Sequence, residues 1–93
     1  MTIYHVIKQR RSRIGMDYIH DFGTYKHKTS AMDAVHENIA HIISHSESQG
    51  DFDYVKNEHP NGKYIVVSVY YTSIDNKKTE KFRYYIIEAE IGD

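Results

Sequence analysis

The chain of 93 residues contains no cysteine, one proline and five glycines. The absence of cysteine excludes disulfides, thiolate nucleophiles and thiolate metal sites. The glycines stand alone, so the sequence has no glycine-rich loop of the kind that cradles phosphate groups. No apolar run approaches the roughly 20 residues of a membrane-spanning helix, and the first residues lack the hydrophobic region of a signal peptide. We therefore expect a cytoplasmic protein without a membrane partner.

Catalytic motifs are also scarce. No serine lies in a nucleophile-elbow context such as G-x-S-x-G. The acidic pairs Asp51/Asp53 and Glu88/Glu90 each place two carboxylates on one side of a strand, which can serve acid–base chemistry but is more typical of a solvent-facing strand. We expect a protein with no enzymatic activity and no cofactor.

The net charge of −1 conceals an uneven distribution of charge. Residues 1–28 carry a formal charge of +4, whereas residues 29–93 carry −5. A basic start on an acidic body predicts a polarised surface that can orient a charged partner. With 40% hydrophobic and 27% charged residues, the chain fits one globular domain, residues 1–93, with a radius of gyration of about 12 Å.

Residue patterns predict five strands and one helix. The strands are expected at 2–8, 16–25, 51–56, 63–74 and 81–91, and the helix within 26–45. This order, β-β-α-β-β-β, predicts an α+β fold: a two-layer sandwich of an antiparallel sheet of four or five strands with one helix packed on one face. The strand at 63–74 is apolar on both sides and is expected inside the sheet, while the last strand is a candidate for pairing at an edge.

The predicted helix has an apolar stripe that should face the sheet. Its members recur at spacings of three and four residues: Met32, Val35, Ile39 and Ile42, with Ile43 beside them. Ser30, followed three residues later by Asp33, resembles a capping box at the start of the helix. After the helix, Gly50 is available for a positive φ angle. Further on, Pro60 suits the second position of a turn and Gly62 its last position.

Histidines suggest two candidate sites. Glu37, His41 and His45 lie one turn apart on the helical side that faces away from the core, and the His-x-x-x-His spacing can chelate Zn²⁺ or Ni²⁺. We favour the alternative that this side is a solvated, pH-sensitive face without a functional metal, because an outward face offers little support around a metal. His5 and His20 are expected to be cross-strand neighbours in the first hairpin.

The candidate binding residues fall into two sets. Four cations are expected at the exposed tip of the first hairpin: Lys8, Arg10, Arg11 and Arg13. Four tyrosines are expected on the sheet face away from the helix: Tyr4, Tyr18, Tyr70 and Tyr84. Tyrosine and arginine dominate the energetics of protein interfaces, and they can also contact phosphates and stack on bases.

The segment DFGTYKHKTSAMDAV, residues 21–35, resembles a pattern shared by small β-β-α modules, including the arm-type DNA-binding modules of phage integrases. Those modules usually place three strands before the helix, whereas two are predicted here, so their DNA-contacting residues cannot be carried over. In size and in its lack of a catalytic motif, the chain is also similar to small phage-encoded accessory and inhibitor proteins, including anti-CRISPRs.

The function expected from the sequence is non-enzymatic binding of a macromolecule through the basic hairpin and the tyrosine face. A protein partner is favoured, and a phage or mobile-element inhibitor is the most specific version of this expectation. Homodimerisation through the tyrosine face is a variant of it. The alternative is a nucleic-acid-binding module that uses the basic hairpin, although the acidic remainder of the chain argues against a dedicated one.

Overall fold

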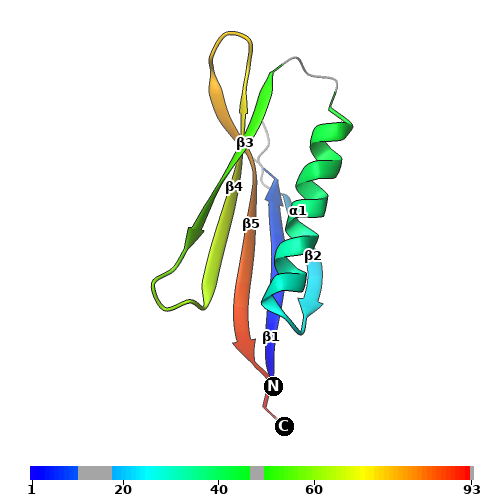
Figure 1. Ribbon diagram of the computed structural model, residues 1–93, viewed down its shortest axis with the longest axis vertical. Coiled ribbons are helices and arrows are strands. Elements are labelled where there is room, and N and C mark those ends of the chain that lie inside the picture. Colours follow the sequence, from blue (N-terminus) through cyan, green and yellow to red (C-terminus); the bar gives the residue numbers. More distant parts are fainter. Residues whose placement is uncertain (11–17, 47–49, 93) are drawn as a thin grey trace.

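The computed structural model describes residues 1–10, 18–46 and 50–92, which form one antiparallel sheet of five strands and one helix (Figure 1). The elements are β1 (Thr2–Arg10), β2 (Tyr18–Tyr25), α1 (Lys28–Ser44), β3 (Asp51–Glu58), β4 (Tyr64–Thr72) and β5 (Lys78–Glu90). This order confirms the predicted α+β class. The molecule is longer than expected, with a radius of gyration of 14.5 Å and a longest extent of 52 Å, and its β4–β5 hairpin projects beyond the end of α1 (Figure 1).

The strands follow the order β2-β1-β5-β4-β3 across the sheet. β4 has a neighbour on both sides, which confirms the predicted interior position. The prediction that the last strand forms an edge is wrong, because β5 lies in the middle and pairs with both β1 and β4. The edges are β2 and β3. Strand order depends on pairing between distant segments, and local residue patterns do not report it.

The two ends of the chain lie together at one end of the sheet (Figure 1). β1 and β5 are antiparallel neighbours, with Thr2 opposite Glu90. The amine of Met1 donates a hydrogen bond to the carbonyl oxygen of Ile91 at 3.1 Å. The first and last strands of the chain are therefore hydrogen-bonded neighbours in the interior of the sheet.

The hydrophobic core lies between α1 and one face of the sheet, which we call the helix face. The helix lies over β1, β2 and β5. Val6 is opposite Ile86, and Ile86 is opposite Ile65, so alternate residues of three strands share this face. The buried core residues are Val6, Ala31, Val35, Ile39, Ile65, Val67, Val69, Tyr84 and Ile86.

The helix begins earlier than its capping pattern predicted. His27 is the N-cap residue and its side chain makes no capping hydrogen bond, whereas Ser30 lies inside the first turn. The predicted capping box at Ser30 is therefore wrong. The buried residues of α1 recur at a spacing of four and face the core: Ala31, Val35 and Ile39. Ile43 continues this spacing but is 44% exposed, because the end of α1 extends past the tip of β1 (Figure 1).

Of the two predictions made for glycines, the turn at Gly62 is confirmed and the positive φ angle at Gly50 is wrong. Gly62 donates its backbone N–H to the carbonyl oxygen of His59 at 2.8 Å and has a φ of +73°, so the predicted turn with Pro60 in second position is confirmed. Gly50 does not adopt a positive φ. Instead it occupies a tight contact, since its N–H donates to the hydroxyl of Tyr71 at 3.1 Å and a Cβ atom would collide with that side chain.

Candidate interaction surface

Lys8 is not at an exposed hairpin tip, so this placement was wrong. β1 continues through Arg10, which puts Lys8 on the helix face in phase with Val6. Its ammonium donates to Oδ1 of Asn38 at 3.0 Å and lies 4.4 Å from the ring centroid of Phe82. Burial, and then the charge of Arg10, lower the pKa of Lys8. The lysine thus joins α1 to the sheet, with its ammonium held between Asn38 and Phe82.

The remaining cations of the predicted tip are only partly described. Arg10 is exposed at the end of β1, opposite Phe82 on one side and Tyr18 on the other. Tyr18 is 53% exposed. Arg11 and Arg13 lie outside the described residues. Arg10 therefore marks the end of the sheet where β5 begins.

Three of the four predicted tyrosines lie on the wrong side of the sheet. Tyr18 is one of them, because it pairs with Arg10, which is in phase with Val6 on the helix face. Tyr84 is 0% exposed beneath α1, where its hydroxyl donates to Oδ1 of Asn38, and burial raises its pKa. Tyr4 packs against the same core. The reason is the alternation of a strand, because Tyr4 shares the face of the fully buried Val6. Tyr70 does lie on the opposite face, since it follows the buried Val69.

The opposite face of the sheet, here called the open face, carries a different set of apolar residues. No helix or strand within residues 1–10, 18–46 and 50–92 covers it. Strand alternation places on it, besides Tyr70, the partly exposed residues Ile3, Ile7, Tyr64, Val66, Tyr85 and Ile87. The sequence could have revealed these residues once one core position on each strand was known. Because side chains alternate along a strand, every one of them lies on the face opposite to Tyr84 and its cross-strand partners Lys8 and Val67.

A polar network holds Tyr85 in place near the middle of the open face. The Tyr85 hydroxyl donates to Oε1 of Gln9 at 3.0 Å and accepts from Nη1 of Arg83 at 3.3 Å. Arg83 in turn lies 2.9 Å from the carboxylate of Glu80. The hydrogen bond to Tyr85, followed by that to Glu80, raises the pKa of Arg83. Two hydrogen bonds therefore fix the orientation of the Tyr85 side chain.

Charged side chains surround this apolar surface, and several are acidic. Strand register places Asp21 and Asp53 on the open face near its two edges, with Glu80 toward the β4–β5 hairpin. The guanidinium of Arg83 is already bonded to Glu80. Lys78 also reaches this face, with its ammonium 4.7 Å from the ring centroid of Tyr70. The open face thus combines an apolar, tyrosine-bearing middle with a border of both charges, in which Asp21 and Asp53 mark the two edges.

The predicted pair of His5 and His20 does not form. The register of β1 with β2 puts His5 opposite Thr24, and His20 opposite Lys8. His5 Nε2 instead lies 2.8 Å from Oδ1 of Asp21, which also accepts the backbone N–H of Gly23 at 2.7 Å. The hydrogen bond from Gly23, and then that from His5, lower the pKa of the Asp21 carboxyl.

This lowered pKa predicts a pH dependence of stability. A carboxyl with a depressed folded-state pKa stabilises the fold above its unfolded pKa of about 3.9, and the contribution is lost as pH falls through the folded value. We expect Asp21→Asn to be less stable than wild type at pH 7 and the difference to shrink below about pH 4. Urea denaturation at a series of pH values measures this, with Asp33→Asn, an exposed helical residue, as control. A constant difference across the series would contradict the assignment.

Glu37, His41 and His45 are all exposed on α1, as the helical phase predicted. The rings of His41 and His45 lie 4.1 Å apart, and Nδ1 of His45 is 2.9 Å from the carbonyl oxygen of His41. This contact satisfies a backbone acceptor at the end of the helix. Among the residues that the structure describes, no group of three or more His, Asp or Glu side chains could hold a metal ion, so Glu37 does not complete a ligand set.

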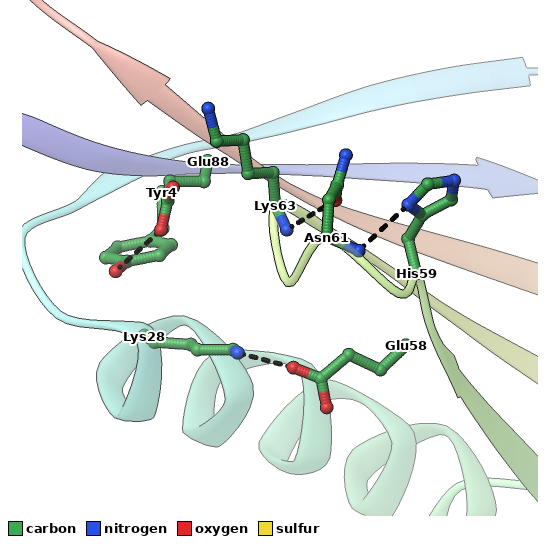
Figure 2. Close-up of polar contacts among 7 residues, drawn as sticks. All are labelled: Tyr4, Lys28, Glu58, His59, Asn61, Lys63 and Glu88. Atoms are coloured by element: carbon green, nitrogen blue, oxygen red, sulfur yellow. Dashed lines mark hydrogen bonds and ion pairs between the residues drawn. The ribbon is translucent and has the colours of Figure 1, made fainter.

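Figure 2 shows the polar contacts where α1 begins. Nζ of Lys28 lies 2.6 Å from Oε1 of Glu58 and so ties the start of α1 to the end of β3. This hydrogen bond raises the pKa of Lys28 and lowers that of Glu58. The Tyr4 hydroxyl donates to Glu88 at 3.2 Å nearby. A shallow cleft of about 260 Å³ lies between the start of α1 and β3, and Lys28 and Lys56 are among the residues that line it. These contacts fix the helix on the sheet.

Comparisons with known proteins found no similar protein: the chain matches no family model, no curated protein and no solved structure. No helix in the described part of the chain has the length and apolar character needed to cross a membrane. The fold and its surface define a small single-domain α+β protein with one helix-covered and one open sheet face.

Proposed function

We propose that this protein is a non-enzymatic, cytoplasmic binding protein that docks a protein partner on the open face of its sheet. The observation that carries the proposal is an uncovered five-stranded face whose middle is apolar and rich in tyrosine. Tyrosine buries a large area while keeping a polar group for hydrogen bonding, which suits it to protein interfaces. Tyr85 is held by Gln9 and Arg83, so little of its conformational freedom remains to be lost on binding.

The charges of the open face support a protein partner over a nucleic acid. Phosphate backbones bind through lysine and arginine contacts that displace counterions. The carboxylates of Asp21 and Asp53 at the edges of this face would repel phosphates, and the guanidinium of Arg83 is already paired with Glu80. A partner with a basic rim around an apolar centre fits this surface better. An inhibitor encoded by a phage or another mobile element is the more specific form of the proposal, supported by the small size of the chain and its lack of a catalytic motif.

Site-specific photo-crosslinking tests the proposal. A photoreactive phenylalanine analogue is placed at Tyr64 or Tyr70 on the open face, and at Ala40, an exposed position on α1, as control. In cells of the source organism, we expect both open-face positions to give the same protein adduct, insensitive to nuclease, and the α1 position to give none of it. Equal labelling from all three positions, or no protein adduct from the open face, would overturn the proposal.

A second candidate function is supported by the cations at the end of the sheet where β1 finishes. Arg10 lies opposite Phe82, so it is close to the β4–β5 hairpin that carries Lys77, Lys78 and Lys81. A basic β-hairpin can follow a phosphate backbone. Fluorescence anisotropy with labelled DNA and RNA tests this alternative. Micromolar binding that weakens steeply with salt, and falls further in a Lys77→Glu/Lys78→Glu variant, would support it; no binding at about 50 mM salt would remove it.

A further inference from the structure

The edge strand β3 lacks several of the usual defences against pairing. All eight of its residues pair with β4 without a register shift, and the strand contains no proline. Tyr54 is 47% exposed and Val55 is 41% exposed in its middle. Edge strands that stay unpaired are commonly short, bulged, charged or interrupted by proline, and β3 has the charges alone: Asp51, Asp53, Lys56 and Glu58. The other edge, β2, does have a break in its pairing, between Val6 and Ile7 of β1.

The outward hydrogen-bonding groups of β3 belong to its even-numbered residues. His59, just after the strand, donates its N–H inward to the carbonyl oxygen of Tyr64 at 2.8 Å. Because the direction alternates along an antiparallel strand, Asn57, Val55 and Asp53 also face β4. Tyr54 therefore points its N–H outward, and it bonds the carboxylate of its neighbour Asp53 at 2.8 Å. A side chain, rather than another strand, satisfies this donor.

We propose that β3 pairs with β3 of a second copy of this chain, antiparallel, about a two-fold axis that passes through Val55. Two sheets of five strands then become one sheet of ten. This inference concerns the edge and does not rest on the proposed partner of the open face. The outward N–H and C=O groups of Tyr54 and Lys56 form the central hydrogen bonds of the new ladder, and the N–H of Tyr54 exchanges its bond to Asp53 for one to the other copy.

The residues of β3 are complementary to themselves in this register. A two-fold axis perpendicular to the sheet keeps each side chain on its own face, so Val55 meets Val55 of the other copy on the open face. Lys56 lies opposite Tyr54, an aromatic ring that a cation can approach. Asp53 lies opposite the neutral Asn57. No like charges are opposed in the middle of the new ladder.

Other registers are less favourable. An axis through Asp53 or through Lys56 puts two like charges directly opposite each other, which is destabilising. An axis through Tyr54 puts Val55 opposite the carboxylate of Asp53. The axis through Val55 alone buries this exposed apolar side chain against another apolar one.

The position of the helix leaves this edge accessible. The backbone of α1 lies over β1, β2 and β5, and its contacts with β3 are made by side chains on the helix face, such as His36 with Tyr54 and Lys28 with Glu58. Figure 1 shows β3 ending on the side of the sheet opposite to α1 and β2. The two-fold operation places the helices of both copies on the same side of the joined sheet. The two open faces then form one continuous surface.

The absence of cysteine makes a direct test simple. In the proposed register the two Val55 Cα atoms are about 4.5 Å apart, within the range that a disulfide spans. The two Asn57 residues are separated by four strand positions, or about 13 Å. Under mild oxidation we expect Val55→Cys to form a disulfide dimer at least about tenfold faster than Asn57→Cys. Equal, slow rates for the two variants would overturn the proposal.

The oligomeric state of the unmodified chain gives a second measurement. We expect analytical ultracentrifugation to show a monomer–dimer equilibrium for wild type. Val55→Lys, which opposes two cations at the axis, should weaken it by at least about tenfold, with circular dichroism confirming that the variant is folded. A wild-type monomer at every accessible concentration would overturn the proposal. Val55→Cys is close to wild type in size, so the cross-linking result stands even if Val55→Lys fails to fold.

Discussion

Replacing Tyr84 with alanine is expected to lower the free energy of unfolding by about 3–5 kcal/mol, because removing a large buried aromatic ring leaves a cavity. Tyr84 is fully buried, and its ring meets that of Phe22 edge-on at 6.1 Å between centroids. Its hydroxyl bonds Asn38, which also accepts from Lys8. One side chain therefore joins β5, α1 and β1. Urea denaturation followed by circular dichroism measures the change.

Two matched variants separate the contributions of Tyr84. Tyr84→Phe keeps the ring and removes the hydroxyl, so we expect a loss of about 1–2 kcal/mol, that of one buried hydrogen bond. Tyr64→Ala removes a tyrosine from the open face, where it is partly exposed, and should cost less than half of the Tyr84→Ala effect. If the two alanine variants lose equal stability, the assignment of the two sheet faces is wrong.

Gly50→Ala is expected to destabilise the fold by about 2–3 kcal/mol, because it forces a side chain into a filled space. A Cβ atom on Gly50 would overlap the carbonyl oxygen of Thr72 and approach Cε2 of Tyr71 to 2.5 Å. The ring of Tyr71 is itself packed against Phe52 at 5.1 Å between centroids, so it cannot withdraw freely. The melting temperature and the urea midpoint of the variant should both fall.

Gly92→Ala is the control for this substitution. A Cβ atom there meets nothing within 4 Å, so its effect should stay within about 0.5 kcal/mol. An equally small effect of Gly50→Ala would show that the segment before β3 shifts without cost, and the close approach of Gly50 to β4 would then have no structural role.

The order of the strands and the helix along the chain could be predicted, because each element has its own local spacing of apolar residues. The change from alternation to a spacing of three and four residues marks α1 between the strands. The turn at Pro60 and Gly62 likewise follows from the backbone preferences of two residues. The solvent-facing side of the helix followed from the same phase, which correctly placed Glu37, His41 and His45 outside.

The candidate binding surface could not be predicted in the same way. β4 is apolar on both sides, with the buried Ile65, Val67 and Val69 alternating with Tyr64 and Val66, so its composition does not say which side meets the helix. The identity of the buried face depends on packing between distant segments. Without it, Tyr4 and Tyr84 could not be distinguished from the tyrosines of the open face.

Lys8 shows how a small error at an element boundary changes a functional hypothesis. The sequence pattern placed this lysine at the end of the first strand and in the exposed hairpin tip, whereas β1 runs two residues further, to Arg10. The extension fixes the alternation, and the ammonium comes to lie beneath α1 beside Asn38 and Phe82. The hairpin register that separates His5 from His20 is equally hard to predict, because no distinctive residue marks which positions of two strands lie opposite each other.

The meeting of both chain ends at β1 and β5 has a mechanical consequence. Because Thr2 and Glu90 are opposite each other in an antiparallel pair, a force that pulls the two ends apart acts across the strands instead of along them. The hydrogen bonds between β1 and β5 then break one after another from the Thr2–Glu90 end, because the applied force acts on one bond at a time. We expect this domain to unravel at low force from its centre, separating β1 and β2 from β3 and β4 before either edge is disturbed.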